Sequence, residues 1–323
     1  MNEKNSVFFI SMPSVNDIHH STFKSLVLFV QNLLTVVHEK DLLLVVVDSE
    51  TEEKLKDHIP KTNLISGTIP DTRIRDFSAI QTQAGLFKYW YRPGYLKKSE
   101  AAHIEKHYTT WFNSLGIAHK KVNLRLEGGN FNYNGEHSGI TTARIFTDNY
   151  ENSQSDIISL LKETLELEQL AILPEIPGEK MGHSDGMVKW LDKETLAVCD
   201  FEPEFANSVR QVISQDLKDV EVVLVPYKPE DDYWKGFMNA MGIYVKAMTT
   251  ENAIYVPQYS MESDHEALDI FKQHTTKEVI PVSVGKLGRI GRSVRTLTWQ
   301  LTGQEAQQVI DKVRQNTLSS EQD

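Results

Sequence analysis

The segment TFKSLVLFVQNLLTVVHEKDLLLVVVD (22–48) decides the fold. Its first part repeats apolar residues with the 3.6-residue period of a helix, and its end is the Leu- and Val-rich run of a buried strand. The same helix-then-strand pattern recurs in four later segments, at 101–126, 155–173, 204–225 and 265–284. This fivefold recurrence predicts an architecture built from repeated units.

Further strand-like runs lie between these segments. They are ITTARIFTD (140–148), MVKWLDKETLAVCDF (187–201), which is hairpin-like around 192–194, and AIYVPQY (253–259). Each unit therefore holds several strands and one helix, which fits a radial arrangement of small blades better than one doubly wound sheet. We predict an α/β fold, a five-bladed α/β propeller of pseudo-fivefold strand–helix units.

The composition is that of a globular protein with a buried core. The chain has 323 residues, of which 40% are hydrophobic, and a formal net charge of −11. Because nucleic acids and anionic membranes attract positive surfaces, we expect neither as a partner and favour small molecules or proteins. No Pro/Gly/Ser-rich linker interrupts the repeats, so we predict a single domain over 1–323 with a disordered tail after about Asn316.

Neither a membrane span nor a secretory signal is expected. The longest apolar region, 23–37, is interrupted by polar residues and is shorter than the roughly 20 residues that cross a bilayer. The N-terminal residues lack the charged start and long apolar centre of a signal peptide, so we expect a cytoplasmic protein. Cys199 is the sole cysteine, which excludes an internal disulfide and a thiolate metal cluster, and we predict no cofactor and no metal.

Five polar loops, three of which contain glycine, lie between the units. In a radial fold such loops converge on the axis, which would bring Asp76, Glu127, His183, Asp185 and Thr296 together from distant parts of the chain. The loops are IPDTRIRDF (69–77), EGGNFNYNG (127–135), PGEKMGHSDG (177–186), KPEDDYW (228–234) and GKLGRIGRSVRT (285–296).

Each motif in these loops has two interpretations. If GHSDG (182–186) is extended, His183 and Asp185 share a face as a proton donor beside a carboxylate; otherwise it is a loop histidine bonded to its neighbour. LEGGN (126–130) permits close approach of the backbone to a ligand, or is a plain turn. Asp76 in DTRIRDF (71–77) needs a buried cationic partner, or the segment is a solvated loop.

In combination these motifs resemble the agmatine deiminase and bacterial peptidylarginine deiminase family of the guanidino-group-modifying (pentein) superfamily. NAIYVPQY (252–259) and GRIGRSVRTLTWQL (288–301) complete the resemblance, which covers nearly the whole chain in the correct order. It implies a five-bladed α/β propeller whose partner is a small guanidino compound or an arginine-containing peptide. A homodimer is common in similar proteins.

The resemblance also implies roles for individual residues. Two carboxylates, here Asp76 and Asp185, hold a planar guanidinium through paired hydrogen bonds. A cysteine thiolate attacks the central carbon, and His183 gives a proton to the departing amine. The resemblance places Glu127 and Asn130 of LEGGN in the substrate site as well.

The alignment puts Thr296 where the family has its nucleophilic cysteine. An unactivated hydroxyl is a far poorer nucleophile at neutral pH than a thiol. Cys199 does not replace it, because it lies on the far arm of the hairpin that follows GHSDG. Five further positions differ from the family. Arg73, Arg292 and Arg295 stand for its tryptophan, glycine and histidine, and Ser78 and Ala79 stand for its Gly-Pro pair.

Three functions stay open at this point. The chain is a guanidino-binding pseudoenzyme, an enzyme of altered chemistry that uses His183 with Asp76 and Asp185, or a nucleophile mutant of a working deiminase. The changed neighbours argue against a single engineered change. The added arginines favour a ligand with a carboxylate or phosphate group, or else they form surface salt bridges.

One further pattern is the HIEKH segment (103–107). His103 and His107 share a helical face at a spacing that can bind zinc, but no third ligand follows from the sequence. We expect a solvated helix face there.

Overall fold

The repeated helix-then-strand units are present in the fold. The computed structural model describes residues 4–16, 20–230, 233–234 and 236–320. All five segments form a helix followed by a strand. These pairs are α1 (His20–Val36) and β2 (Asp41–Val47), α4 (Lys98–Ser114) and β6 (Lys120–Arg125), α6 (Gln154–Leu165) and β9 (Gln169–Leu173), α7 (Pro203–Asp216) and β12 (Glu221–Val225), and α8 (Ser263–Gln273) and β17 (Glu278–Ser283).

Each unit contributes a small mixed sheet with one recurring topology. An edge strand runs antiparallel to a middle strand, and the middle strand pairs in parallel with the strand that follows the helix. A parallel pair needs a long crossover, which the helix supplies. The edge and middle strands are β4 (Ile80–Thr82) and β5 (Gly85–Trp90), β7 (Asn132–Tyr133) and β8 (Ser138–Thr142), β10 (Val188–Trp190) and β11 (Thr195–Cys199), and β15 (Met248–Thr249) and β16 (Ala253–Gln258).

The two ends of the chain meet in a remaining sheet. Its order is β18 (Trp299–Thr302), β1 (Ser6–Ser11), β2 and β3 (Leu64–Ser66), with β18 antiparallel to β1. A separate two-stranded hairpin joins β13 (Tyr233–Trp234) to β14 (Phe237–Met238). The predicted mixed α/β fold is confirmed.

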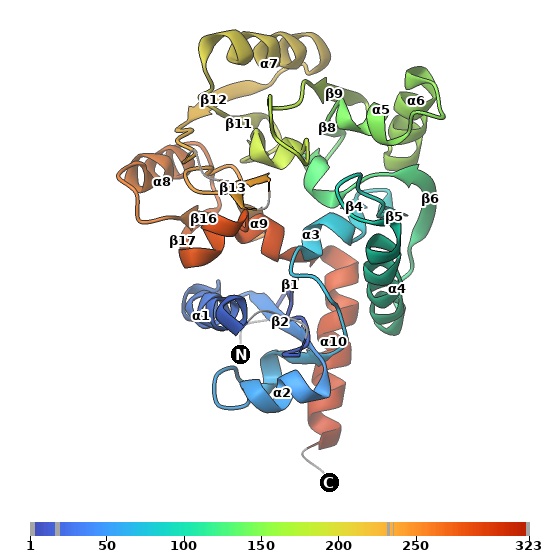
Figure 1. The fold of residues 1–323 in the computed structure, drawn as a ribbon, viewed down its shortest axis with the longest axis vertical. Helices are drawn as coiled ribbons and strands as arrows, with labels where there is room; N and C mark the ends of the chain where they lie inside the picture. The colour runs from blue at the N-terminus through green and yellow to red at the C-terminus, as the bar shows by residue number, and fades with distance from the viewer. Residues whose placement is uncertain (1–3, 17–19, 231–232, 235, 321–323) are drawn as a thin grey trace.

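The long helices cover the outside of the sheets. Figure 1 shows α1, α4, α6, α7 and α8 at the periphery, while α3 (Ile74–Phe77) and α9 (Val294–Leu297) lie near the centre. In α6 the residues Ile157, Leu161 and Leu165 recur every four positions and are buried, which explains how an amphipathic stripe fixes the helix to its sheet. Glu166 ends this helix in a left-handed conformation, with φ of 53°.

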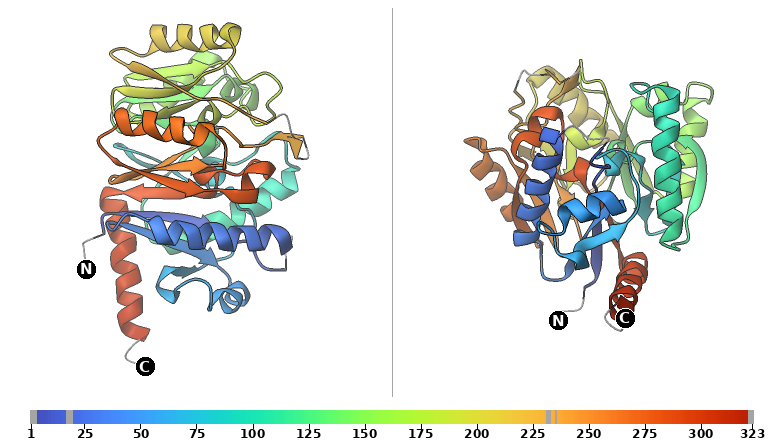
Figure 2. Two further views of the ribbon diagram at one scale, coloured as in Figure 1. Left: turned by 90° about the vertical axis from the view of Figure 1, so that its left-hand side faces the viewer. Right: turned by 60° about the horizontal axis from the view of Figure 1, so that its bottom comes forward.

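The C-terminal helix α10 (Gly303–Ser320) extends away from the sheets, and both ends of the chain lie on the same side (Figure 2). Its buried residues Ala306, Val309 and Ile310 attach it to the sheet that contains β1. The disordered tail after about Asn316 stays a prediction, and residues 321–323 lie outside the described part of the chain. Within the described residues, no helix is both apolar and long enough to span a bilayer.

Two details differ from the expectations. The run at 140–148 is not strand throughout, because after Thr142 it turns into the short helix α5 (Arg144–Asp148). GHSDG is not extended, since Ser184–Gly186 forms the 3₁₀ turn η3. Gly182 enters this turn with φ of 66°, a left-handed conformation that favours glycine.

Candidate active site

Five short segments, each directly preceding an edge strand, supply the polar residues of the site. They are α3 before β4, η2 (Gly128–Asn130) before β7, η3 before β10, the loop 239–247 before β15, and α9 before β18. Because each segment opens the same strand of a similar sheet, side chains far apart in the sequence meet at one end of these strands.

The centre of the site is a histidine between two carboxylates. His183 Nε2 lies 3.3 Å from Glu127 Oε2, and His183 Nδ1 lies 3.9 Å from Asp76 Oδ1. All three side chains are buried. Asp76 Oδ2 has no hydrogen-bond partner among the described residues. The site therefore holds one buried carboxylate oxygen whose capacity to accept hydrogen bonds is unused within the described residues.

Burial and the neighbouring charges shift the pKa values of His183 and Asp76. Burial acts to lower the pKa of His183, but Glu127, Asp76 and Asp185 more than offset it and raise that pKa to about 9. Burial raises the pKa of Asp76. His183 is thus an imidazolium at neutral pH, a proton donor in position.

Asp185 is engaged by the protein's own cations. Lys246 Nζ donates to Asp185 Oδ1 at 2.9 Å, and Arg295 Nε lies 3.5 Å from Asp185 Oδ2. Burial works to raise the pKa of Asp185, yet Lys246, His183 and Arg295 hold it below its usual value. Both oxygens of this carboxylate therefore have a cationic neighbour before any ligand binds.

Asn130 supports the site rather than facing a ligand with its carbonyl. Asn130 Oδ1 accepts from the Ser184 N–H at 3.1 Å and from the N–H and hydroxyl of Thr142 at 3.2 and 3.1 Å. These bonds fix η3, and with it His183 and Asp185. Gly129 has a matching role, because a Cβ there would lie 2.5 Å from His183 Nδ1 and 2.7 Å from Asp76 Oδ1.

The arginines expected near the site are held inside the protein. Arg73 is buried and forms an ion pair of 2.9 Å with Asp71, and its guanidinium lies 5.3 Å from the centroid of the Tyr95 ring. Arg292 donates to Thr72 Oγ1 at 2.9 Å and lies within 4.0 Å of no carboxylate among the described residues. Arg295 Nη2 donates to the Phe131 carbonyl at 2.8 Å. None of the three forms a surface salt bridge.

Thr296 lies on α9 beside Arg295 and is 4% exposed. Cys199 is on β11, the middle strand behind β10, and its Sγ–H donates to the Gly186 carbonyl at 3.4 Å. Burial raises the pKa of the Cys199 thiol far above its usual range. Its thiol is thus inert at neutral pH.

A cavity of about 250 Å³ opens on this end of the strands and reaches Glu127. Its lining includes Tyr95, whose hydroxyl donates to Glu127 Oε2. Arg144 and Lys180 bring positive charge to the opening, and Arg144 is paired with Glu175 at 2.7 Å. Asp148, also in the lining, has a pKa raised to about 6 by burial and by Glu127.

Not every expected loop contributes as predicted. Of KPEDDYW, residues 231–232 lie outside the described part, and Glu230 pairs with Arg289 at 2.7 Å instead of facing the site. The unit of α8 supplies Lys246 from the loop before β15 instead. Neither Lys246 nor Tyr95 could be predicted from the sequence, because neither belongs to a recognised motif. His103 and His107 lie together on α4, with ring centroids 4.4 Å apart.

Comparisons with known proteins identify the family and the fold of the chain. Residues 2–301 match the model of the Porphyromonas-type peptidyl-arginine deiminase family. The solved structure of C. jejuni agmatine deiminase is 20% identical with a TM-score of 0.74, covering 93% of this chain and 94% of that one. Agmatine deiminase of Enterococcus faecalis is 17% identical with a TM-score of 0.74, over 93% and 94% of the two chains. Among curated proteins, none matches this sequence.

The structural likenesses, at these identities, establish the fold, and the family match extends over nearly the whole chain. The motifs that carry it, DTRIRDF, LEGGN and GHSDG, hold Asp76, Glu127 and His183, which the fold brings into contact. The chain belongs to the Porphyromonas-type peptidyl-arginine deiminase family.

Proposed function

We propose that this chain is a pseudoenzyme of its family, which binds a compound with a guanidino or amidino end and an anionic group and does not hydrolyse it through a cysteine. The proposal rests on one observation, the buried and partly unpaired carboxylate of Asp76. This carboxylate is 1% exposed, and its Oδ2 has no hydrogen-bond partner among the described residues. An unpartnered buried carboxylate oxygen is costly, and a planar guanidinium supplies the paired donors that satisfy it.

The charge balance of the site favours a ligand that is not simply a cation. With His183 protonated, the three carboxylates Asp76, Glu127 and Asp185 are matched by three cations. Those cations are His183, Lys246 and Arg295. Arg73 and Arg292 form a second charged group with Asp71. These two arginines and one carboxylate leave one positive charge in excess. A ligand with a carboxylate or phosphate group would balance this excess, whereas agmatine would add to it.

Hydrolysis through a covalent intermediate needs a nucleophile that this site lacks. The proposal places Thr296 at the position of the family's cysteine, and the chain's one thiol, Cys199, is buried on another strand. A structure of C. jejuni agmatine deiminase with a serine in place of a cysteine was solved with substrate bound. In that relative, replacing a thiol by a hydroxyl is compatible with binding.

A second candidate function is acid–base chemistry without a covalent intermediate. This candidate is favoured by His183, which is a buried imidazolium beside Asp76 and Glu127. These three groups could transfer protons to and from a bound ligand. This candidate predicts turnover that is lost in His183→Ala, whereas the pseudoenzyme shows binding alone.

We also propose that the five sheets are blades of one propeller around the site. The repeated order of edge, middle and post-helix strand supports this arrangement, as does the contribution of all five edge strands to a shared cavity.

Calorimetric titration with a matched pair of ligands tests the proposed function. Agmatine and 4-guanidinobutyrate share a guanidino end and differ in an amine or a carboxylate at the other end. We expect 4-guanidinobutyrate to bind at least tenfold more tightly than agmatine, Asp76→Asn to weaken binding about tenfold or more, and ammonia release to be absent.

The matched control is Asp269→Asn, which removes a carboxylate from the exposed face of α8. It should bind like the wild type, and circular dichroism should show that both variants are folded. A preference for agmatine, or unchanged binding by folded Asp76→Asn, would contradict the proposal.

A further inference from the structure

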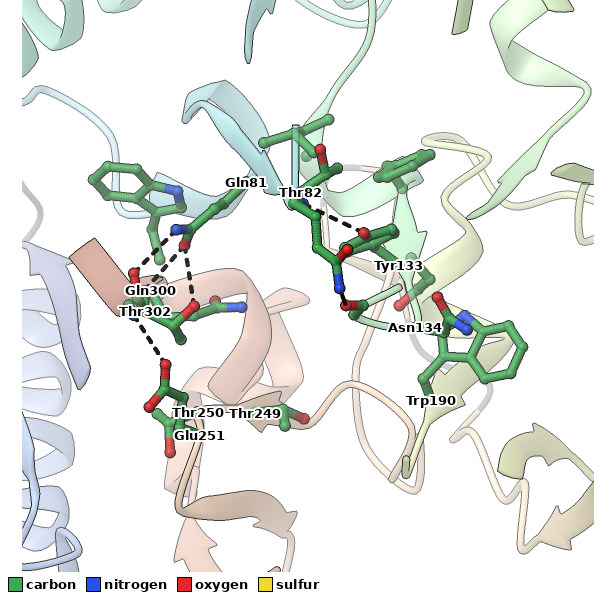
Figure 3. A pocket seen from close by; sticks show the side chains of 18 of the residues that line it. Gln81, Thr82, Tyr133, Asn134, Trp190, Thr249, Thr250, Glu251, Gln300 and Thr302 are labelled. Carbon is green, nitrogen blue, oxygen red and sulfur yellow. Dashed lines mark hydrogen bonds between the residues drawn. The ribbon is translucent and has the colours of Figure 1, made fainter. Parts of the chain in front are cut away.

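A second and larger cavity lies at the other end of the edge strands. It has a volume of about 540 Å³ and is lined by residues of β4, β7, β10, β15 and β18. The candidate active site occupies the segments that precede these strands, whereas this lining continues past their ends to Gln83, Gly135, Asp192, Glu251 and Glu305. Figure 3 shows side chains from several strands, among them Gln81, Tyr133, Trp190 and Thr249, around the cavity. Nothing in the proposed function uses it.

Three buried cationic side chains line this cavity: Arg75 of α3, Lys189 of β10 and Arg295 of α9. Each is at most 7% exposed. Lys189 has neither an ion pair nor a hydrogen bond from its side chain among the described residues. By contrast, Arg75 donates to Gln300 Oε1, and Arg295 donates to the Phe131 carbonyl.

None of the acidic residues that line the cavity forms an ion pair with Lys189, Arg75 or Arg295 in the described part of the chain. Asp192 accepts from the backbone N–H groups of Glu194 and Thr195, and Glu305 accepts from Gln81. Glu251 accepts from the Gly303 N–H at 2.9 Å. Asp185 contacts Arg295 but is shared with Lys246. The cluster therefore keeps an excess of positive charge.

The three cations repel one another in a site with little water. Burial lowers the pKa of Lys189 well below its ordinary value, and Arg295 and Arg75 lower it further. The pKa of Arg75 is lowered in the same way, by burial and then by Arg295. A group of like charges in this position destabilises the empty protein, and an anion bound among them would relieve that strain.

The cavity also offers neutral donors. Trp190 Nε1 and Thr249 Oγ1 are buried and have no hydrogen-bond partner among the described residues, and both residues belong to the lining. Buried donors of this kind are usually satisfied by a partner. They complement an oxyanion, which accepts several hydrogen bonds at once.

We propose that this cavity is a binding site for a small oxyanion, the carboxylate or phosphate group of a metabolite, held by Lys189, Arg75 and Arg295. The cavity is distinct from the candidate active site around Asp76, and anion binding there does not depend on the proposed function. Arg75 and Arg295 lie between the two, since each also borders the candidate active site.

Calorimetry and thermal unfolding with inorganic phosphate and with citrate test the site at matched ionic strength in chloride. Wild type, Lys189→Met and Lys218→Met are compared, because Lys218 is an exposed lysine whose loss changes the net charge equally. We expect at least one oxyanion to bind the wild type and Lys218→Met alike at millimolar concentration or tighter. We expect Lys189→Met to bind it at least tenfold more weakly.

The empty Lys189→Met protein should unfold at a higher temperature than the empty wild type, because a buried repelling charge is gone. This result also shows that the variant folds. Equal binding by folded Lys189→Met, or no binding of either oxyanion by the wild type, would overturn the proposal.

Discussion

Lys246 Nζ lies 2.9 Å from Asp185 Oδ1, inside the candidate active site. Asp185 is 1% exposed, and burial works to lower the pKa of Lys246 but the contact with Asp185 raises it. The protein thus supplies its own cation to a carboxylate that the family resemblance assigns to a guanidinium. Lys246 and a guanidinium ligand compete for the same oxygen.

Replacing Lys246 by Met should therefore have two opposite effects. The protein should lose about 3 kcal/mol of unfolding free energy, because buried Asp185 loses its closest cation and keeps Arg295 as its ion-pair partner. Affinity for agmatine should rise about tenfold, since the freed carboxylate accepts the guanidinium. Urea unfolding and calorimetry measure the two quantities.

The control for Lys246→Met is Lys218→Met, which changes net charge on the surface only. Neither stability nor affinity should change there by more than about 0.5 kcal/mol. A fall in agmatine affinity of Lys246→Met would mean that Lys246 contributes to binding instead of competing with it.

A methyl group at Gly129 should disturb the site. The added Cβ would fall 2.5 Å from His183 Nδ1, closer than real contacts allow, so the imidazole must move away from Asp76. We expect Gly129→Ala to bind 4-guanidinobutyrate at least tenfold more weakly. Calorimetry measures the binding, and circular dichroism shows whether the variant is folded. Unchanged binding by folded Gly129→Ala would contradict the role of the His183 position in binding.

Loss of the Asn130 carbonyl should loosen η3. Removing it leaves the buried Ser184 N–H and the Thr142 N–H without their acceptor, which costs about 1–3 kcal/mol for each unsatisfied group. Asn130→Ala should therefore unfold at lower urea concentration, with an unchanged m-value. Asn207→Ala, on the exposed face of α7, should unfold like the wild type.

His183 should titrate well above an ordinary histidine. Its carboxylate neighbours overcome the effect of burial and raise the pKa to about 9, so the proton resonance of its ring should change with a midpoint near pH 9. The stability from the imidazolium is then fully present below about pH 6.5 and is lost as pH rises through 9.

Glu127→Gln removes the nearest carboxylate and should lower this midpoint. The resonance is assigned from its disappearance in His183→Asn. A midpoint at or below pH 6.5 in the wild type would mean that burial outweighs the carboxylates.

Local pattern was sufficient to predict the repeated units. The apolar period of 22–48 and its four counterparts matched a helix and strand in every case, because each unit buries one helix face against one strand. The strand predicted at 140–148 is wrong in its second half. Its β-branched start forms β8, but the chain then turns at Ala143 into the helix α5. Propensity there was overridden by tertiary context.

The site was predicted only as far as the motifs extend. Asp76, Glu127, His183 and Asp185 do converge, because loops in corresponding positions of similar units meet. Lys246 was missed as a partner of Asp185, since a partner from a distant unit leaves no local signal. For the arginines the sequence left open an anionic ligand or surface salt bridges. Arg73 instead pairs with Asp71 of its own loop and is buried, and Arg295 pairs with Asp185 of another unit.

The most direct test of the central claim is ammonia release from agmatine, arginine and an arginine-containing peptide. The protein as it stands and its Thr296→Cys variant are assayed side by side. The account predicts no release by the threonine protein, because it lacks a nucleophile, and none by Thr296→Cys alone, because Lys246 and Arg295 still engage Asp185. Release by Thr296→Cys alone would mean that the site is an intact deiminase missing only its thiol, and release by the threonine protein would contradict the claim itself.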